Sequence, residues 1–273
     1  MKKLFATDLD GTLFNVLHAT DFIILKGIRK ILKRGDCFAI ATGRNMRVEH
    51  IIHDFKDLDV HCIAMNGAMI LDPQKNIIYE RGIDKEIIAD LFDSFPEIGF
   101  EFIGREHVYV TFDKESLKDQ MDQRNLMVRL IYRRFKKLYT SEYIYNCDRD
   151  KILSQDILKV NCKIRDPQTK QRFNDYLKKH QDQIINAPFA EMTYELTAAG
   201  VNKAEAIRHL AKILKIRDKD VYVYGDGDND IEMLKMFENS YAPKNACDNA
   251  RKAAGQIIGN NNRYSVIRHM IRQ

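Results

Sequence analysis

Short apolar runs, each followed by a helical pattern, are the feature that most constrains the fold of this chain. In the first part of the sequence these runs alternate with apolar residues spaced three or four apart, such as Ile24, Ile28 and Ile31. The same alternation returns near the C-terminus, around Ile207. It predicts βαβ units, and therefore an α/β fold with a parallel sheet covered by helices on both faces. The expected strands are Leu4–Thr7, Cys37–Ala41, Val60–Met65 and Val221–Tyr224.

The middle of the chain has a different pattern, in which apolar and polar residues alternate. Phe100, Phe102, Val108 and Val110 follow the period of two of an antiparallel strand pair, with a turn expected at Gly104–Glu106. Further elements expected here are helices over residues 85–95 and 114–138 and a strand over residues 159–164. This part is therefore predicted to be of the α+β type.

The length of 273 residues exceeds what one hydrophobic core usually supports, so two domains are expected. We predict an α/β core over residues 1–82 and 197–273, interrupted by an α+β domain inserted over residues 83–196.

Two aspartates one residue apart, Asp8 and Asp10, follow the first predicted strand and precede Gly11. A strand that ends at Asp8 holds its carboxylate at the carboxyl edge of the sheet, and Gly11 lets backbone amides approach an anion closely. Crowded carboxylates repel each other, so such a pair indicates a bound cation, a shared proton, or both. A solvated turn is the alternative, because Asp-x-Asp-Gly is common turn chemistry.

Two more polar sites adjoin predicted core elements. The second strand runs into Thr42, Gly43 and Arg44, where a hydroxyl beside a glycine suits a phosphate oxygen, although an ordinary helix N-cap is the alternative. Lys203 lies at the start of a predicted helix. A cation is unfavourable there because of the helix dipole, so we expect an anionic partner to hold it.

An acidic cluster containing Asp226, Asp228 and Asp230 follows the strand Val221–Tyr224. Carboxylates gathered at a strand end favour a hard divalent cation. The cluster is not an EF-hand, because Ile231 and Phe237 occupy the positions where that loop needs glycine and glutamate. The sequence also lacks the glycine-rich P-loop of nucleotide-binding proteins.

The composition is that of an ordinary globular protein, with 45% hydrophobic and 30% charged residues. No apolar run approaches the ~20 residues of a membrane span, and no signal-peptide pattern is visible at the N-terminus. The five cysteines are scattered without a zinc or disulfide spacing, so a reducing cytoplasm is expected. The net charge of +5 favours anionic ligands but is too small for a nucleic-acid binder. A basic cluster within residues 124–137 is interpreted as a solvated helix face.

Four motifs at the two ends of the chain resemble those of the haloacid dehalogenase superfamily of phosphohydrolases, in the family's order. They are Asp8-Leu9-Asp10-Gly11-Thr12-Leu13, Ala41-Thr42-Gly43-Arg44, Lys203 and Gly225-Asp226-Gly227-Asp228-Asn229-Asp230. The segment Met65-Asn66-Gly67-Ala68 and the long insert resemble the Cof-type (type IIB) branch, whose members carry a cap over the active site. The resemblance implies a Rossmann-like parallel-sheet core with an inserted α+β cap of type C2.

The resemblance also implies a mechanism. Asp8 would attack phosphorus to form an aspartyl-phosphate, and Asp10 would protonate the leaving alcohol and then accept a proton from water. Mg2+ would be held by the carboxylates of Asp8 and Asp226 and by the main-chain carbonyl of Asp10. Asp230 would orient Lys203 or a metal-bound water, whereas Asp228 is left open as a solvated turn residue. The residues expected to contact phosphate or substrate are Thr42, Gly43, Arg44, Asn66, Gly67, Lys203 and Asn229.

The resulting hypothesis is a Mg2+-dependent phosphatase that acts on small phosphorylated metabolites, with sugar phosphates first among them. A phosphomutase or phosphotransferase shares every core residue and remains an alternative. A non-catalytic phosphometabolite-binding protein or a receiver-type regulator is less well supported, since neither accounts for both Asp8 and Asp10. His107 and Tyr109 either reach a ligand or lie on an exposed strand face. No nucleic acid, membrane or obligate protein partner is expected.

Overall fold

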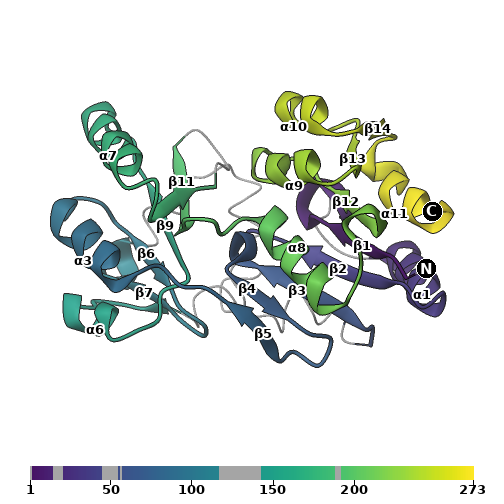
Figure 1. The fold of residues 1–273 in the computed structure, drawn as a ribbon. Helices are drawn as coiled ribbons and strands as arrows, with labels where there is room; N and C mark the ends of the chain where they lie inside the picture. The colour runs from purple at the N-terminus through teal and green to yellow at the C-terminus, as the bar shows by residue number, and fades with distance from the viewer. Residues whose placement is uncertain (1, 15–20, 45–54, 56, 117–142, 188–191) are drawn as a thin grey trace. The chain divides into compact units, whose positions relative to one another are not determined.

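The computed structural model of the protein describes residues 2–14, 21–44, 55, 57–116, 143–187 and 192–273. These residues form two compact units (Figure 1). The first unit contains the described parts of residues 2–81 and 199–273, and the second contains those of residues 82–186 together with a strand that ends at Ala198. The helix expected over most of residues 114–138 and the basic cluster within residues 124–137 lie outside the described residues.

A sheet in the order β14-β13-β12-β1-β2-β3-β4-β5 forms the centre of the first unit. All pairs from β14 to β3 are parallel, and β4 and β5 complete the sheet in antiparallel fashion. The strands are β1 (Leu4–Thr7), β2 (Cys37–Ala41), β3 (Val60–Ala64), β4 (Met69–Leu71), β5 (Ile77–Glu80), β12 (Val221–Tyr224), β13 (Asn239–Pro243) and β14 (Gln256–Ile258). The prediction of an α/β fold with a central parallel sheet is therefore confirmed.

The register of the central strands brings their carboxyl ends to one edge. Thr7, the last residue of β1, pairs with Tyr224 on one side and with Ile40 on the other. The strand expected over Val60–Met65 ends one residue earlier, at Ala64, because Met65 and Asn66 have the positive φ angles of 51° and 56° that end an extended strand.

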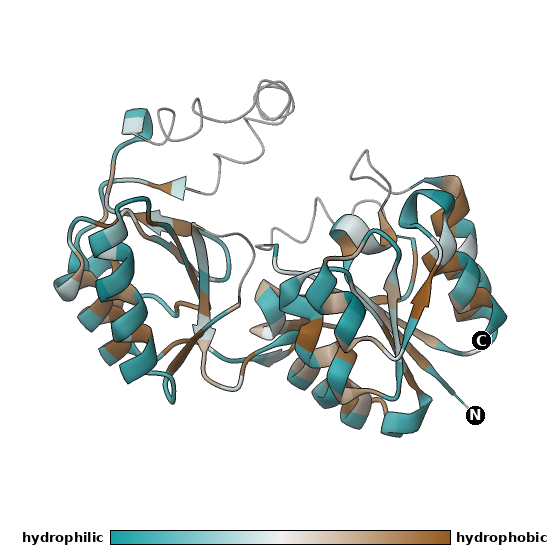
Figure 2. Cartoon of the chain, turned by 90° about the horizontal axis from the view of Figure 1, so that it is seen from above, coloured by the Kyte–Doolittle hydropathy of each residue, from teal (hydrophilic) through white to brown (hydrophobic). Residues whose placement is uncertain are grey.

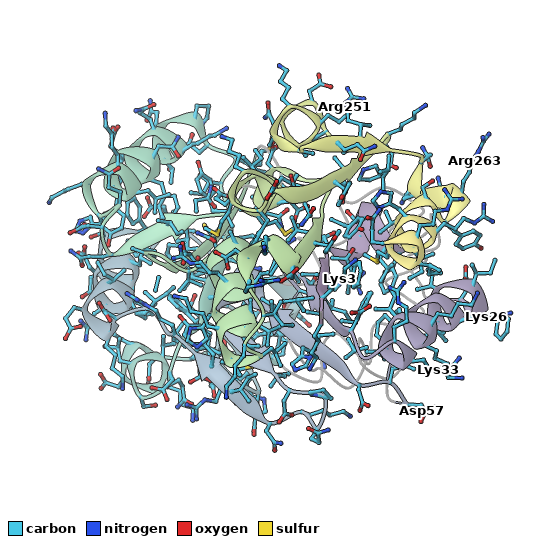
Figure 3. All side chains as sticks on the ribbon, turned by 45° about the vertical axis from the view of Figure 1, so that its right-hand side comes forward. Lys3, Lys26, Lys33, Asp57, Arg251 and Arg263 are labelled. Atoms are coloured by element: carbon cyan, nitrogen blue, oxygen red, sulfur yellow. The ribbon has the colours of Figure 1, made fainter. Side chains whose placement is uncertain are left out.

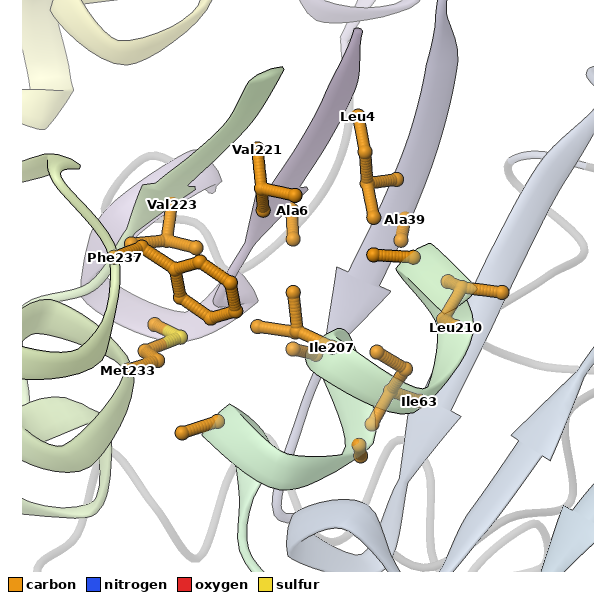
Figure 4. Close-up of a cluster of buried hydrophobic side chains, with 14 of the residues drawn as sticks. Leu4, Ala6, Ala39, Ile63, Ile207, Leu210, Val221, Val223, Met233 and Phe237 are labelled. Atoms are coloured by element: carbon orange, nitrogen blue, oxygen red, sulfur yellow. The ribbon is translucent and has the colours of Figure 1, made fainter. Parts of the chain in front are cut away.

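Successive side chains of a strand point to opposite faces of the sheet, and all four residues of β1 are buried. Both faces are therefore apolar, and helices cover both of them. Leu4 and Ala6 pack with Ile207 and Leu210 in the cluster shown in Figure 4, and Phe5 faces the other way, where the guanidinium of Arg34 lies 5.8 Å from its ring. The helices on the cluster side are α8 (Lys203–Ile213), α9 (Ile231–Met236) and α10 (Asp248–Ala253), and those on the other side are α1 (Phe22–Lys33) and α11 (Ser265–Arg272).

The second unit is built on a mostly antiparallel sheet in the order β10-β11-β9-β6-β7-β8. Its strands are β6 (Glu101–Ile103), β7 (Val108–Val110), β8 (Tyr143–Ile144), β9 (Lys159–Lys163), β10 (Ile184–Asn186) and β11 (Thr193–Ala198), and its helices are α3 (Lys85–Ser94), α6 (Arg149–Leu153) and α7 (Pro167–Lys179). Phe173 of α7 is fully buried and makes T-shaped, edge-to-face ring contacts with Phe95 and Tyr194. Figure 2 shows hydrophilic and hydrophobic residues mixed along the helices of both units, as amphipathic helices require.

The expected turn between β6 and β7 is present, since the Gly104 amide donates to the carbonyl of His107. The exposed strand face stated as one alternative for His107 and Tyr109 does not describe Tyr109, which is only 6% exposed and donates from its hydroxyl to Gln155. The expected alternation of buried and exposed residues fails at Tyr109 because Gln155, in the loop after α6, accepts the hydrogen bond of the hydroxyl. The ring can therefore be buried without leaving the hydroxyl unpaired.

All five cysteines are free thiols, and only Cys247 is more than slightly exposed. Among the described residues, no helix combines the length and apolar character needed to cross a membrane.

The contact between α1 and α11 yields a first prediction. A Cβ on Gly27 would lie 2.2 Å from Cγ1 of the buried Ile267. Gly27→Ala should therefore lower the free energy of unfolding by about 1–2 kcal/mol, because overpacking outweighs the ~1 kcal/mol gain in helix propensity. Urea unfolding measures the change, with the exposed Lys30→Ala on the same helix as control. A more stable Gly27→Ala variant would contradict the tight contact.

Candidate active site

The carboxylate of Asp8 lies at the carboxyl end of β1, the strand between β12 and β2. The Asp8 amide donates to the carbonyl of Tyr224, which extends the parallel pairing by one residue, and the side chain is 7% exposed. The chain then coils through residues 9–13, where Gly11 has a φ of 85°. A Cβ on Gly11 would lie 2.2 Å from Oδ2 of Asp226, so glycine is required here both for its φ and for the close approach to Asp226.

Lys203 is the first residue of α8, yet its side chain is only 1% exposed. Its Nζ lies 2.7 Å from Oδ1 of Asp8 and 2.7 Å from Oδ1 of Asp230. Asn202 caps the helix by accepting a hydrogen bond from the Glu205 amide. The anionic partner expected for Lys203 is thus a pair of buried carboxylates, and these offset the unfavourable dipole at the start of the helix.

Asp230 and Asp226 occupy the turn after β12. Oδ2 of Asp230 accepts hydrogen bonds from the amides of Asp226 (2.8 Å) and Gly227 (2.9 Å), while its Oδ1 accepts from Lys203. Asp226 accepts a hydrogen bond from the hydroxyl of Thr12. Both oxygens of Asp230 are therefore engaged within the protein, and this aspartate holds the turn and Lys203 in place.

Burial dominates the electrostatics of this cluster. It raises the pKa of Asp8 to about 8, against the attraction of Lys203 and with the repulsion of Asp230 and Asp226 added. Burial also raises the pKa of Asp226 to about 6, against the hydrogen bond from Thr12. For Lys203, burial alone would lower the pKa, but Asp230 and Asp8 outweigh it and the pKa lies above its usual value. Lys203 is therefore charged, and its single positive charge faces a cluster of three carboxylates.

The donor set fits a hard divalent cation. One oxygen from each of Asp8, Asp226 and Asp230 lies within 4.8 Å of the others. Among the described residues, Oδ2 of Asp8 accepts no hydrogen bond. Carboxylate oxygens at this spacing, with raised pKa values for Asp8 and Asp226, suit a cation such as Mg2+, which binds one or two carboxylates and keeps the rest of its shell for water or phosphate.

Thr42, Gly43 and Arg44 follow β2, next to β1 in the sheet. Thr42 is buried, its Oγ1 accepts from the Arg44 amide at 3.1 Å, and its carbonyl accepts from the Asn66 amide at 3.0 Å. The guanidinium of Arg44 binds both oxygens of Asp10, with Nε 2.7 Å from Oδ2. Arg44, expected to face the substrate, pairs with Asp10 in this structure.

Asn66 and Gly67 lie in the turn after β3, and they have different surroundings. Oδ1 of Asn66 accepts a hydrogen bond from Asn229 at 3.3 Å, so the turn after β3 meets the motif Gly225–Asp230 at this point. Gly67 has a φ of 107°, and a Cβ there would lie 2.4 Å from the carbonyl oxygen of Asn202. Gly67 is therefore needed for the approach of the turn to α8.

Other residues around the site were not identified from the sequence or were interpreted differently. Asp228 is not simply a solvated turn residue, since its Oδ1 accepts a hydrogen bond from Asn249 at 2.9 Å. Asn245 was missed: its Nδ2 donates to the carbonyl of Gly11 at 2.7 Å, and its Oδ1 accepts from the amide of Asn261. The position of Asn245 just after β13 was the available signal, because every polar side chain at this edge of the sheet is a candidate.

Comparisons with known proteins agree with this geometry. A sequence profile of haloacid dehalogenase-like hydrolases matches residues 5–271. The 5-amino-6-(5-phospho-D-ribitylamino)uracil phosphatase YbjI of Escherichia coli is 26% identical over 97% of this chain and 93% of its own length. A Bacillus subtilis phosphatase of the same description, YwtE, is 26% identical over 97% of this chain and 95% of its own.

Solved structures show the same fold. A haloacid dehalogenase-like hydrolase from Bacillus subtilis superposes with a TM-score of 0.83 at 22% identity, covering 99% of both chains. The sugar phosphatase BT4131, of subclass IIB of the same superfamily, superposes with a TM-score of 0.77 at 19% identity, covering 99% of this chain and 98% of its own.

The profile match spans all four motifs and every residue of the carboxylate cluster. It confirms the resemblance inferred from the sequence, and with it the expected class of enzyme, a phosphoric monoester hydrolase. The chain belongs to the haloacid dehalogenase-like hydrolases, in their Cof-type phosphatase branch.

Proposed function

We propose that this protein is a Mg2+-dependent phosphatase that hydrolyses small phosphorylated metabolites through a phosphorylated Asp8. The observation that carries the proposal is the position of the Asp8 carboxylate. This carboxylate is buried at the end of β1, where Lys203 donates to its Oδ1 and Asp226 lies close by. Its Oδ2 accepts no hydrogen bond from the described residues. A binding protein has no use for a carboxylate prepared in this way.

In the proposed reaction, Oδ2 of Asp8 attacks phosphorus, and the bond from phosphorus to the alcohol oxygen breaks. Asp10 protonates that leaving oxygen and then accepts a proton from the water that attacks the phosphoaspartate, releasing phosphate and restoring Asp8. Arg44 would position Asp10 through its bidentate contact, beside its expected place facing the substrate.

The phosphate group would be held by a set of donors around Asp8. Lys203 carries the full positive charge of this set and faces Oδ1 of Asp8, where charge redistributes as the new bond forms. The hydroxyl of Thr42 lies at the neighbouring strand end. The other members of the set are the backbone of Gly43 and Gly67 and the side-chain amides of Asn66 and Asn229.

Asp8 and Asp226, with the main-chain carbonyl of Asp10, would hold Mg2+. The bound ion would offset the repulsion between the nucleophilic carboxylate and the phosphate oxygens. Asp230 would act on this site only through Lys203 and the turn that carries Asp226.

The substrate class is inferred from the relatives, which include a sugar phosphatase and phosphatases of a phosphoribityl compound. We propose that the second unit is the cap that selects among such substrates, with residues 83–196 as its limits. The free cysteines fit an enzyme that works in a reducing cytoplasm.

The nucleophile is tested by Asp8→Asn. The amide is nearly the same size as the carboxylate but cannot form the phosphoenzyme, so turnover of an aryl phosphate with Mg2+ should fall by more than about a thousandfold while the fold is kept. Asp228→Asn is the matched control, because Asp228 bonds Asn249 outside the carboxylate cluster and should keep activity within about threefold. Activity of Asp8→Asn within about tenfold of the unmodified protein would exclude Asp8 as the nucleophile.

The metal site predicts how stability depends on pH. The pKa values of Asp8 and Asp226 are about 8 and about 6 in the folded protein, against 3.8 ordinarily, so folding without metal takes up protons between about pH 4 and 8. The melting temperature of the metal-free protein should therefore fall as pH rises through this range. Mg2+ needs the ionised carboxylates, so its stabilising effect should grow from pH 5.5 to 8.5.

Thermal melts with EDTA or excess Mg2+ at each pH measure this effect. Asp226→Asn should lose most of the stabilisation by Mg2+. A shift in melting temperature that is the same at all pH values, or unchanged in Asp226→Asn, would show that Mg2+ binds elsewhere.

The role of the second unit is tested by replacing residues 83–196 with a short linker. Turnover of large phosphorylated metabolites should fall far more than turnover of a small aryl phosphate, because the chemistry lies in the core and the cap supplies leaving-group contacts. Circular dichroism and a melting transition must first show that the shortened chain folds. A folded core that kept its full preference among metabolites would refute the proposed division of roles.

A further inference from the structure

The C-terminal part of the first unit carries an unbalanced positive charge. Asp248 is the last acidic residue of the chain, and the 25 residues after it include Arg251, Lys252, Arg263, Arg268 and Arg272. Helix α1, which packs against α11, likewise contains basic residues and no acidic ones. Figure 3 shows Arg263 projecting outward from the C-terminal segment, and Lys26 and Lys33 projecting outward from α1.

Three of these arginines line one open groove between β14 and α11, with a volume of about 410 Å³. Ser265, Arg268, His269 and Arg272 form a single stripe along α11, at intervals of three and four residues, while Val266, Ile267 and Met270 face the core. The residues that line the groove are Gln256, Ile257, Ile258, Gly259, Arg263, Ser265, Arg268, His269 and Arg272. None of them is acidic.

The floor of the groove is preformed. The ring of His269 lies 4.3 Å from that of Tyr241, and its Nδ1 lies 3.1 Å from the hydroxyl of the fully buried Tyr224. Burial and the neighbouring Arg272 lower the pKa of His269, so at neutral pH the imidazole is uncharged. The positive charge of the groove therefore comes from its guanidinium groups.

Contacts inside the protein account for these guanidinium groups only in part, since the guanidinium of Arg268 lies over the ring of Tyr264, 5.9 Å from its centre. Within the described part of the chain, no carboxylate forms an ion pair with Arg263, Arg268 or Arg272. Cations in the last turn of a helix are stabilised by its dipole, which accounts for Arg272 but not for Arg268, the fourth residue of α11. The dipole does not account for Arg263, which precedes the start of α11. An external anion is the partner that would satisfy all three.

We propose that this groove binds a compact polyanion, a small molecule that carries a diphosphate or a comparable pair of phosphate groups. Planar guanidinium groups match phosphate oxygens in pairs, and the hydroxyl of Ser265 offers one further donor. The volume is that of a small-molecule site. An extended acidic peptide is disfavoured because β14 offers an edge of only three residues.

The groove is a second anion site, separate from the carboxylate cluster. None of its lining residues belongs to that cluster, which has the opposite balance of charge: Asp8, Asp226 and Asp230 surround the single cation Lys203. The proposal is independent of the reaction assigned to Asp8.

The test is calorimetric titration of the full chain with methylenediphosphonate, whose P–C–P link resists hydrolysis, in EDTA and low salt. Arg268→Gln/Arg272→Gln should weaken binding by at least about tenfold, because two charge-assisted contacts are lost. Lys26→Gln/Lys30→Gln removes the same charge from exposed positions on the adjacent helix α1 and should change affinity by less than about twofold. Arg263→Gln alone should weaken binding by about threefold or more.

Several results would overturn the proposal. One is the absence of binding to the unmodified protein at millimolar diphosphonate. A second is equal weakening in the α11 and α1 variants, which would indicate only a diffuse field. A third is unchanged affinity in the α11 variant, which would place the anion at the carboxylate cluster. A fourth is tighter binding of a hexa-aspartate peptide than of the diphosphonate. Melting temperatures of all variants show whether each is folded.

Discussion

The ammonium group of Lys203 is the constraint on which the rest of the site depends. It lies 2.7 Å from Asp8 and from Asp230, and all three side chains are buried. Through this one cation, the first residue of α8 is joined to the end of β1 and to the turn after β12. A buried charge left without its partner costs several kcal/mol, so removing the charge of Lys203 should cost the most stability, because both carboxylates would lose their cation.

The same burial that fixes these groups also makes the site suited to a further cation. Lys203 is a single positive charge shared by two carboxylates, and Asp226 lies within reach of both. Burial raises the pKa values of Asp8 and Asp226, and repulsion between the neighbouring carboxylates adds to the increase. Asp10 differs from these carboxylates in having a guanidinium partner, since Arg44 binds both of its oxygens.

Much of this arrangement could be predicted from the sequence, because it follows from strand ends. Period-two burial and strand–helix alternation place Asp8, Thr42 and Asp226 directly after neighbouring parallel strands, and the structure has them there. The dipole argument required an anion near Lys203 without naming Asp230. The catalytic roles of these residues remain predictions.

Side-chain pairings formed after a turn could not be predicted in the same way. Arg44 binding Asp10, Asn249 binding Asp228 and Asn245 binding the carbonyl of Gly11 all join residues far apart in the sequence. Each depends on the direction in which a side chain leaves an irregular segment, and no periodicity encodes that direction. The end of β3 shows the same limit, since the positive φ of Met65, a non-glycine residue, is imposed by its tertiary surroundings.

The place of β1 in the sheet explains why the carboxylate of Asp8, the proposed nucleophile, lies where it does. The chain starts at the centre of the sheet, moves outward through β2 and β3, and later returns to the other side of β1 with β12 and β13. The strand order therefore reverses at β1, and the loops that leave β1 and β12 diverge around its carboxyl end. A side chain at that point can be buried against both neighbours and still face an opening. Asp8 meets both conditions, with its backbone amide bonded to β12 and Oδ2 left without a hydrogen bond from the described residues, which is the combination a nucleophile requires.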